Sequence, residues 1–368
     1  MKRVVHATTV HPRDDVRILR KECVSLARAG YEVVLLVGDG LGEAHVEGVR
    51  IVDVGVQPAG RLARMRTQPK RAWQALERLA PALVQVHDPE LLGLAARAAA
   101  CGIAAVYDAH EDVPRQMLTK QWIPAPMRPP LSALFERYEN RQVRRISAVI
   151  GATPYIAERF AGVAARSVAV CNYPLPDELA PACSALPRER MVCYVGGLMR
   201  TRGLLQMVRA VALLPGVRLV LCGRFEDEAF ERELRAEPGW SQVDWRGQVG
   251  REAVRDVMAR ACAGLVTLLP MPSYLDALPI KMFEYMSAAL PVVASDFPLW
   301  RGIVESSGCG ICVDPADPQA VAGALRRLLD DPQAARACGE AGRAAVRATY
   351  NWPSAERVLL ALYAELLP

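Results

Sequence analysis

The stretch LDALPIKMFEYMSAALPVVASD, residues 275–296, brings two carboxylates and an ammonium group close together in the sequence. Asp276 and Glu284 are eight positions apart, and Lys281 lies between them. A carboxylate such as Glu284 can accept two hydrogen bonds from a vicinal diol such as a ribose. Burying Glu284 in a mostly apolar helix is costly unless it has a partner, so we expect a ligand or an arginine to contact it.

A helix must position these groups. Pro279 fits a first helical turn, because its missing N–H would have had no partner there, and the pattern predicts a helix over about 279–288. Amides near Ala277 and Leu278, at the positive end of the helix dipole, then form a site for an anion such as phosphate. Lys281 can point its ammonium toward the same anion.

A second loop has the composition of a phosphate-binding loop. The sequence GGLMRTRG, residues 196–203, follows an apolar strand-like run. Gly196 and Gly197 permit close approach of a ligand to the backbone, and Arg200 and Arg202 can clamp a diphosphate. Helix amides and two guanidinium groups on a diphosphate, with a carboxylate on the sugar of the nucleoside, describe a site for a nucleotide-diphosphate sugar.

Short β-rich runs alternate with amphipathic segments along most of the chain, which indicates parallel strands covered on both faces. The first series of runs is 3–8, 32–38, 49–54, 83–87, 104–110 and 147–152, and the second is 191–197, 217–223, 263–269, 291–296 and 310–315. We expect two doubly wound Rossmann-like α/β domains facing across a cleft, with ligands at the carboxyl edges of the sheets. The predicted boundaries are an N-terminal domain 1–172, a linker 173–190, a C-terminal domain 191–350, and a C-terminal helix 351–368 that packs back on the N-terminal domain.

Composition bounds the function. The chain has 368 residues, 52% apolar and 23% charged, which suffices for two cores and argues against disorder. The net charge of +5 fits anionic small molecules or an anionic membrane surface and is too weak to indicate nucleic acid. No secretory or membrane-spanning run is evident, so we expect a cytoplasmic protein. The single CxxC, Cys309 to Cys312, lacks a second pair, and we interpret it as packing rather than a metal site.

Six stretches in register resemble one family: HPRDDVRILRKECVSLARAGYEVVLL, VHDPELL, VYDAHEDVPRQ, YVGGLMRTRG, LPIKMFEYMSAALPVVASD and YNWPSAERVLLALY. In their order and spacing they are similar to retaining glycosyltransferases of the GT-B fold, family 4, and within it to the bacterial branch that builds surface polysaccharides. The resemblance covers essentially the whole chain. Asp276 and Glu284 occupy the two acidic places of the family's Glu-x7-Glu element, the first with Asp in place of the usual Glu.

The resemblance implies a role for each matching residue. Glu284 would bind the ribose, Arg200 and Arg202 the diphosphate, and Asp276 the hydroxyls of the transferred sugar. The stretch DWRGQVG would hold the base by backbone contacts at Gln248 and Val249. His110, at the end of strand 104–110, would face the anomeric centre across the cleft. A capping role for Asp276 and a strand-end role for His110 stay open.

The chain also departs from the family in its first loop. Many relatives have a Gly-Gly pair there, whereas this loop has Arg13, Asp14 and Asp15, so we assign it, together with Glu111, to the acceptor side. Ala289 stands where relatives often end the helix with Gly, which in a left-handed conformation would cost about 1 kcal/mol.

The family reaction needs no cofactor and no metal. It would move a sugar from a nucleotide-diphosphate sugar to a glycan or lipid-linked acceptor with retention of configuration, the departing phosphate taking the acceptor proton. Arg202, His110 and Asp276 would be the catalytic residues. Two alternatives stay open, a nucleotide-sugar 2-epimerase of GT-B fold and a non-catalytic nucleotide-sugar-binding subunit.

The segment 115–145 mixes exposed-type apolar residues, among them Trp122 and Met127, with many arginines. It could lie on an anionic membrane, at the inner face of the cell membrane, to reach a lipid-linked acceptor. A helix with a solvated basic face is the alternative.

Overall fold

The computed structural model describes residues 1–120, 122–175 and 188–368, which form two units. The N-terminal domain comprises Met1–Asn172 together with Trp352–Pro368, and the C-terminal domain comprises Tyr173–Asn351. Most of the segment interpreted as a linker, 173–190, lies outside the described residues.

The N-terminal domain is built on one eight-stranded sheet with the order β3-β4-β2-β1-β5-β6-β7-β8. Its strands are β1 Arg3–Ala7, β2 Glu32–Val37, β3 Ala44–Val46, β4 Val49–Asp53, β5 Leu83–Val86, β6 Ala104–Ala109, β7 Ala148–Gly151 and β8 Ser167–Ala169. All neighbours are parallel except β3 and β4. The strand order reverses between β1 and β5, and open α/β sheets bind ligands at the carboxyl end of such a switch point.

The helices of this domain are short except for α2 and α5. They are η1 Val16–Cys23, α1 Val24–Arg28, α2 Arg61–Leu79, η2 Pro89–Leu91, α3 Leu92–Ala100, α4 Val113–Met117, η3 Ala125–Met127, α5 Arg128–Val143, α6 Pro154–Ala161 and α14 Trp352–Leu366. The segment η1 is a π-helix over its whole length, and Asp15 caps it by accepting a hydrogen bond from the Ile18 N–H at 3.0 Å.

The C-terminal domain is built on a six-stranded parallel sheet with the order β11-β10-β9-β12-β13-β14. Its strands are β9 Met191–Val195, β10 Arg218–Cys222, β11 Val243–Trp245, β12 Ala263–Val266, β13 Val292–Ser295 and β14 Gly310–Val313. Its helices are η4 Arg200–Arg202, α7 Leu204–Ala212, α8 Glu228–Ala236, η5 Pro238–Gln242, α9 Arg251–Arg260, α10 Ile280–Ser287, α11 Pro298–Ser307, α12 Pro318–Asp330 and α13 Pro332–Ala348. The order reverses between β9 and β12, which places the switch point beside the loop 196–203.

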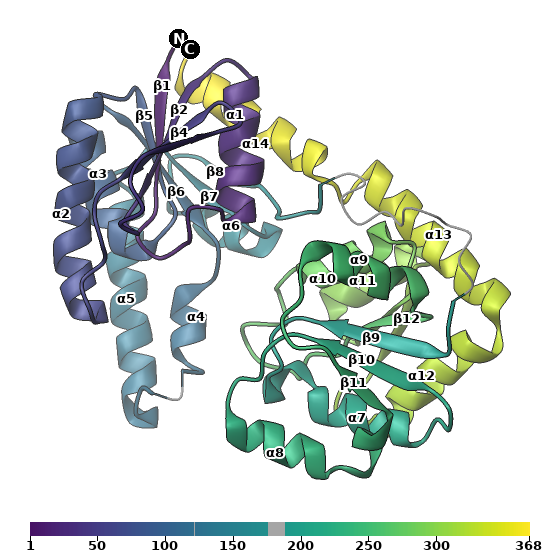
Figure 1. Cartoon of the computed structure of the whole chain (residues 1–368). Coiled ribbons are helices and arrows are strands. Elements are labelled where there is room, and N and C mark those ends of the chain that lie inside the picture. The colour runs from purple at the N-terminus through teal and green to yellow at the C-terminus, as the bar shows by residue number, and fades with distance from the viewer. Residues whose placement is uncertain (121, 176–187) are drawn as a thin grey trace. The chain divides into compact units, whose positions relative to one another are not determined.

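Each sheet is covered by helices on both faces, as Figure 1 shows. The C-terminal sheet separates two apolar clusters, one containing Cys193, Tyr285 and Trp300 and the other containing Leu219 and Leu325. Since central strands are buried on both faces, their sequences are apolar at nearly every position. The prediction of doubly wound α/β domains is confirmed.

The last helix, α14, packs against the N-terminal domain beside η1 and β8 (Figure 1). The indole of Trp352, at the start of the helix, donates a hydrogen bond to the Ser25 hydroxyl at 2.9 Å, and Tyr363 is fully buried. Glu365 pairs with Arg166 at 3.2 Å. The chain therefore returns to its first domain after completing the second.

Ala289 follows α10 with a φ of 52°, so it does adopt the left-handed conformation that usually favours glycine. Its carbonyl oxygen accepts a hydrogen bond from Arg188 Nη2 at 2.7 Å, which holds this turn in place. Ala80 ends α2 in the same conformation with a φ of 44°. In the described part of the chain, the search for membrane-spanning segments finds no helix with the length and apolarity needed.

Candidate active site

The loops after β9 and β12 meet at the carboxyl edge of the C-terminal sheet. The Leu269 N–H donates a hydrogen bond to the Thr201 carbonyl at 3.0 Å, which ties the two loops together. Gly203 begins α7 with a φ of 76°, and a Cβ there would lie 2.0 Å from the Thr267 carbonyl oxygen. Only glycine permits this approach, so the glycine that ends the GGLMRTRG loop has a steric reason.

Arg202 lies at this edge with unsatisfied hydrogen-bonding capacity. Its guanidinium carbon is 5.0 Å from the centre of the Tyr274 ring, and its buried Nε has no hydrogen-bond partner. The Tyr274 hydroxyl lies 3.2 Å from Thr201 Oγ1, which fixes the ring under the guanidinium. Because a buried donor without a partner is costly, this geometry favours binding of an anion by the Arg202 guanidinium.

Glu284 is 3% exposed and is held between two cations. Its Oε2 lies 2.6 Å from Lys281 Nζ, and its Oε1 lies 3.0 Å from Arg251 Nη1. The expectation of an arginine contact is met, but the expected direction of Lys281 is wrong. The i,i+3 spacing along α10 brings the ammonium onto the carboxylate, and that contact replaces the predicted contact with an anion at the start of the helix.

The loop ahead of α10 differs from the prediction. Asp276 lies four residues before the first residue of α10, and Pro279 occupies the cap position, so Asp276 does not cap the helix. The Ala277 N–H is not free, because it donates to the Tyr274 carbonyl at 3.2 Å. The Ala277 carbonyl in turn accepts from the Trp300 indole at 2.7 Å. These two bonds form a turn that consumes one of the two amides predicted to bind phosphate and leaves Leu278 as the remaining one.

Arg200 does not lie beside Arg202. Its Nη1 is 2.7 Å from Glu233 Oε1, and its guanidinium carbon is 4.8 Å from the centre of the Phe230 ring, so it lies on α8. In this arrangement of side chains Arg200 pairs with Glu233, and the two-arginine clamp stays a prediction. A bidentate carboxylate partner 33 residues away was not evident from the loop sequence.

The remaining donor-side residues lie near the same edge. Gly196 and Gly197 follow β9 directly, and the Tyr194 hydroxyl donates to the Gly197 carbonyl at 2.9 Å. Gln248 is exposed and Val249 is half-buried, both in the connection from β11 to α9. This connection leads into α9, whose first residue is Arg251.

The first loop of the N-terminal domain, 11–15, is pinned by ion pairs. Arg13 Nε and Nη2 each lie 2.6 Å from a carboxylate oxygen of Asp39, which lowers the pKa of Asp39. Burial alone would raise the pKa of Asp15, but its contacts with His11 and with the Ile18 N–H lower it to about 2. Asp14 is exposed. Of the three loop residues assigned to the acceptor side, therefore, only Asp14 is unengaged within the described chain.

His110 lies at the carboxyl end of β6, half-buried, with its Nε2 2.8 Å from Asp108 Oδ2. His87, at the end of β5, also contacts this oxygen, at 3.0 Å from Nδ1. Glu111 is exposed beside His110. Asp88, the residue before η2, makes no capping hydrogen bond through its side chain, and its carboxylate accepts from the Thr9 hydroxyl at 3.0 Å and so holds the loop after β1.

The donor atoms of His87, Asp108 and His110 are close enough together to consider a metal ion. However, Arg17 Nη2 lies 2.7 Å from Asp108 Oδ1, and a guanidinium at that distance opposes a second cation on the same carboxylate. The imidazole contacts at 2.8–3.0 Å are also hydrogen-bond distances. A hydrogen-bonded cluster accounts for the geometry without a metal.

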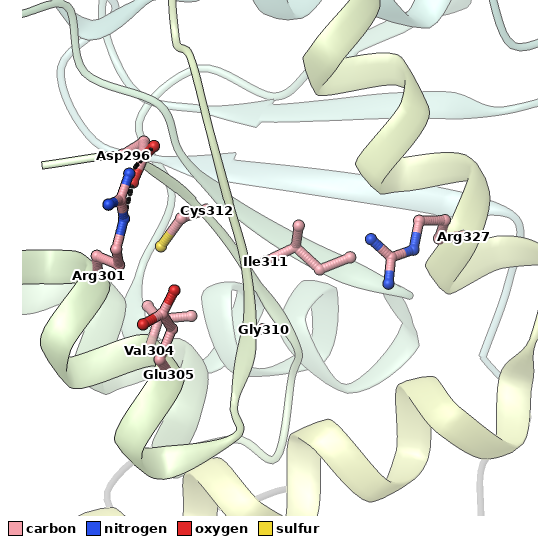
Figure 2. A pocket seen from close by; sticks show the side chains of 8 residues that line it. All are labelled: Asp296, Arg301, Val304, Glu305, Gly310, Ile311, Cys312 and Arg327. Carbon is pink, nitrogen blue, oxygen red and sulfur yellow. Dashed lines mark hydrogen bonds and ion pairs between the residues drawn. The ribbon is translucent and has the colours of Figure 1, made fainter.

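A separate pocket of about 360 Å³ lies against the edge strand β14, between α11 and α12. Figure 2 shows Arg301 paired with Asp296 at its rim, the sulfur of Cys312 nearby, and Arg327 on the far side. None of the residues predicted to bind donor or acceptor lines it. We therefore place the candidate site at the carboxyl edges of the sheets and not in this pocket.

Several residues of the site were not singled out from the sequence. Arg202 is supported by Tyr274 and Thr201, and Glu284 by Arg251. The loop before α10 is held by Trp300, and His110 by Asp108 with Arg17. Only the aromatic residues at 274 and 300, which flank the acidic stretch, gave a signal that could have been used. The others contact the site from elements distant in sequence.

Solved structures share this fold. Sucrose-phosphate synthase from Thermosynechococcus elongatus matches with a TM-score of 0.80 at 18% sequence identity, covering 100% of this chain and 99% of that chain. HepE of Anabaena in complex with UDP-glucose matches with a TM-score of 0.73 at 15% identity, covering 99% and 100%. The two doubly wound sheets, parallel except for β3, and these matches over the whole chain define the GT-B fold.

The family comparisons agree in both halves. Residues 16–172 match the family described as Glycosyltransferase Family 4, and residues 181–345 match Glycosyl transferases group 1. Each half of the chain therefore matches a glycosyltransferase family model, the first half in the N-terminal domain and the second half mostly in the C-terminal domain.

Curated relatives are more distant. The chain is 29% identical over 208 residues to alpha-maltose-1-phosphate synthase of Mycolicibacterium smegmatis, covering 52% of each protein. It is 29% identical over 195 residues to D-inositol 3-phosphate glycosyltransferase of Corynebacterium urealyticum, covering 48% of this chain and 43% of the relative. The aligned part thus spans about half the length of the curated relatives.

Proposed function

We propose that the protein is a retaining glycosyltransferase that moves a sugar from a nucleotide-diphosphate sugar to a hydroxyl of a glycan or lipid-linked saccharide. The observation that supports this most is that two complementary side chains, Glu284 and Arg202, lie in the C-terminal domain near the switch point of its sheet. One is a buried carboxylate suited to a ribose, and the other is a guanidinium with an unsatisfied buried N–H suited to a diphosphate.

Within this proposal the C-terminal domain binds the donor. Glu284 accepts from the ribose hydroxyls, Arg202 contacts the diphosphate, and Asp276 contacts the transferred sugar. Gly196 and Gly197 leave room for the phosphates near the backbone, while Gln248 and Val249 lie beside the base. The UDP and UDP-glucose complexes among the similar folds make a uridine donor the first one to test.

Arg200 can join the phosphates only by leaving Glu233. Both partners of this pair are exposed, by 50% and 41%. Exposed pairs contribute about 0–1 kcal/mol, whereas a charge-assisted bond to a phosphate in a desolvated site is stronger. A bound diphosphate would therefore be able to draw Arg200 away from α8, and Arg202 remains the principal contact.

The chemistry we propose needs no resident metal. Arg202 stabilises the charge that develops on the leaving diphosphate, and this phosphate takes the acceptor proton as the new bond forms on the same face. His110, Arg13, Asp14, Asp15 and Glu111 belong to the acceptor side, with His110 beside the reacting sugar. Removing one such charge-stabilising donor typically costs about 2.7–4 kcal/mol in the transition state.

Donor hydrolysis is the direct test. The chain would be incubated with UDP-, GDP-, ADP- and dTDP-sugars without acceptor, and the released sugar would be followed by proton NMR. We expect slow release of the α-anomer from one donor class, abolished by Arg202→Ala. Initial release of the β-anomer would contradict retention, and binding without any release would favour a non-catalytic sugar-nucleotide-binding subunit.

One observation favours the second candidate, a nucleotide-sugar 2-epimerase. Such an enzyme needs carboxylates and histidines together, and the N-terminal domain gathers Asp108, His87 and His110 at one sheet edge. However, His87 is 2% exposed and Asp108 is paired with Arg17, so only His110 reaches solvent. Deuterium incorporation at C2 of the donor sugar in D2O would identify an epimerase, and its absence would exclude one.

We also propose that the N-terminal domain contacts an anionic membrane through segment 115–145 together with the start of α2. Trp122, Met127 and Leu134 are 67%, 51% and 65% exposed, and Leu62 is 73% exposed. The Arg61 guanidinium lies 5.4 Å from the centre of the Trp122 ring, which joins the two segments in one surface. Apolar side chains among arginines are typical of interfacial binding.

Flotation with liposomes tests this surface. Vesicles with 30% phosphatidylglycerol should carry the protein at 50 mM salt and release it at 500 mM, since the attraction is partly electrostatic. Trp122→Ala should weaken flotation. Trp240→Ala in the other domain serves as the control, because Trp300 is fully buried and its replacement would disturb the core. No flotation at low salt would contradict membrane contact.

A further inference from the structure

Four of the five histidines of the chain gather at the carboxyl edge of the N-terminal sheet. His6 lies on β1 and is fully buried, and His87 follows β5 and is 2% exposed. His110 follows β6, and its ring centre lies 4.8 Å from that of His11 in the first loop. The cluster therefore extends from the interior to the surface that we assign to the acceptor.

Hydrogen bonds join these rings to α14. The Tyr363 hydroxyl lies 3.0 Å from His6 Nε2, and His6 Nδ1 lies 3.0 Å from His87 Nε2. His87 Nδ1 lies 3.0 Å from Asp108 Oδ2, the oxygen that is 2.8 Å from His110 Nε2. A single line of contacts thus runs from the C-terminal helix to His110.

We propose that Asp108 is a positioning residue for His110, and that Tyr363, His6 and His87 form the hydrogen-bonded chain that fixes Asp108. The consequence is one tautomer of His110, with the proton on Nε2 directed to Asp108 and an unprotonated Nδ1 directed away from it. This inference rests on the proposed function, in which His110 lies beside the reacting sugar.

The argument begins with the charge on Asp108. Burial would raise its pKa, but Arg17 and then His110 hold the pKa of Asp108 well below its usual range. Arg17 contacts both carboxylate oxygens, at 2.7 Å from Nη2 and 3.1 Å from Nε. An ionised carboxylate can only accept, so both imidazole nitrogens that contact it must bear protons.

The tautomers of the buried rings follow from this. Burial lowers the pKa of His6 and of His87, so both rings are neutral. With its proton on Nδ1, His87 must accept at Nε2, and His6 must then donate from Nδ1. His6 Nε2 is left to accept from the Tyr363 hydroxyl. His87 Nδ1 and His110 Nε2 lie 3.3 Å apart, and with these assignments both donate to Asp108 Oδ2 and not to each other.

The hydrogen bonds of Tyr363 and Gln85 require one further proton, on Glu22. The Tyr363 hydroxyl also lies 2.8 Å from Gln85 Oε1, so its single proton faces two acceptors. In addition, the buried carboxylates Asp108 and Glu22 share one guanidinium, that of Arg17. In the structure the Gln85 Nε2 donates to Glu22 Oε2 at 2.6 Å. A proton on Glu22, with the Gln85 amide turned over so that its oxygen accepts from Glu22 and its nitrogen donates to Tyr363, resolves both problems. Burial and the nearby Asp108 raise the pKa of Glu22 well above its ordinary value, in agreement.

A fixed tautomer matters for the reaction we propose. A neutral imidazole with a free Nδ1 accepts a hydrogen bond from a hydroxyl, and the opposite tautomer would donate one. In Ser-His-Asp hydrolases, replacing the orienting acid by its amide gives the wrong tautomer and lowers kcat by about 10⁴. Asp108 holds the same relation to His110, so a substrate hydroxyl is the group that this site can recognise.

The wild-type protein tests the tautomers directly. Histidine nitrogens of the full chain, labelled with ¹⁵N, would be observed by long-range proton–nitrogen correlation at pH 8, with each ring assigned by its His→Gln variant. We expect His110 protonated on Nε2, and His6 and His87 protonated on Nδ1. His110 protonated on Nδ1, or a mixture of tautomers in the wild type, would overturn the inference whatever the activity.

Variants then test the consequence. Asp108→Asn should lower kcat at least tenfold, leave the donor KM within threefold, and release His110 from its single tautomer. Tyr363→Phe removes only a hydroxyl and tests the chain even if Asp108→Asn fails to fold. It should leave the His6 proton on Nδ1, because His87 still accepts from it, and should shift the ¹⁵N resonance of His6 Nε2, which loses its donor. Asp53→Asn, whose carboxylate accepts from the Gly55 N–H at 2.8 Å, is the control and should change neither property.

Two results separate this inference from the proposed function. If His110 shows the expected tautomer but His110→Gln keeps full kcat, the positioning geometry stands and the proposed role of His110 fails. If Asp108→Asn keeps wild-type kcat with a randomised tautomer, the positioning role itself fails. An unchanged ¹⁵N resonance of His6 Nε2 in Tyr363→Phe would show that the Tyr363 hydroxyl is not part of the chain.

Discussion

The substitution Glu284→Gln tests the proposed ribose contact with almost no change of shape. A hydrogen bond to a charged group contributes about 1.5–3 kcal/mol, against about 0.5–1.5 kcal/mol for a neutral one. Two ribose hydroxyls that donate to the Glu284 carboxylate should therefore lose about 1 kcal/mol each. The combined loss of about 2 kcal/mol weakens binding of the nucleoside diphosphate about 30-fold.

The effect on stability should be smaller. Lys281 and Arg251, which contact Glu284 at 2.6 and 3.0 Å, are 33% and 46% exposed, so both cations can turn to water when the charge is removed. Partly exposed pairs contribute at most about 1 kcal/mol. A loss of binding in Glu284→Gln would therefore occur in a folded protein, which circular dichroism and a melting curve would verify.

Titration calorimetry provides the assay. The nucleoside diphosphate with the largest thermal shift would be titrated into the wild type, into Glu284→Gln, and into Glu237→Gln, a carboxylate that pairs with Arg209 at 2.7 Å on the same domain. Only Glu284→Gln should lose affinity for the nucleotide, and its affinity for inorganic pyrophosphate should not fall. Unchanged nucleotide affinity, or an equal loss for pyrophosphate, would refute the ribose contact.

Three further predictions concern charge, backbone and acid stability. Arg202→Ala should reduce kcat by about 10²–10³ at saturating donor. Asp14→Ala, at an exposed loop residue, should change kcat less than threefold. Equal rates in the two variants would contradict the contact of Arg202 with the donor diphosphate. Ala80→Gly should raise the free energy of unfolding by about 0.5 kcal/mol, because relief of the left-handed conformation slightly exceeds the entropy that glycine loses. Ala289→Gly should not raise the free energy of unfolding, since it also removes a buried methyl group worth about 0.8 kcal/mol. Urea titrations in which Ala289→Gly stabilises the protein more than Ala80→Gly does would contradict the reasoning. Asp15 has a folded-state pKa of about 2, below its ordinary value, so its contribution is complete above about pH 4 and is lost as the pH falls toward 2; Asp15→Asn should flatten the decline of stability in that window, measured by urea unfolding at each pH.

The long strands could be predicted from the sequence because burial on both faces makes them apolar at nearly every position, and the last helix because one of its faces is heavily apolar. The strands β3, β8 and β11 were not predicted. Each has three residues and they are half-buried or exposed, so neither a continuous apolar run nor a clear alternation develops. Their positions at or near sheet edges explain this composition.

The candidate site was predictable where one short segment contains the chemistry. The burial of Glu284 followed from its place in an apolar helix. The direction of long side chains was not predictable, because Arg200 finds Glu233 on α8 and Lys281 finds Glu284 one turn away. Such pairs depend on which carboxylates the fold brings near, and a linear motif does not contain that information.

The histidine chain shows the same limit more strongly. His87 and His110 were noticed individually at strand ends, whereas His6 was simply one position in an apolar strand and Tyr363 one apolar residue in the last helix. Parallel pairing of β1 with β5 and of β5 with β6 aligns three strand ends, and the return of α14 adds the hydroxyl. His6 and Tyr363 are 357 positions apart in the sequence, and only the topology of the fold brings them into one cluster.

The two domains differ in how they balance charge, and this difference suits two different ligands. At the edge of the C-terminal sheet, Arg202, Lys281 and Arg251 outnumber the carboxylates Asp276 and Glu284, and the Arg202 Nε lacks a partner. Such a site is completed by an anion. At the edge of the N-terminal sheet the buried charges of Arg17 and Asp108 compensate one another, and the half-buried imidazole of His110 contacts Asp108 at the surface of this network. Such a site has no excess charge to attract an anion and can recognise a neutral hydroxyl, which is why we place the donor phosphates on the second domain and the acceptor on the first.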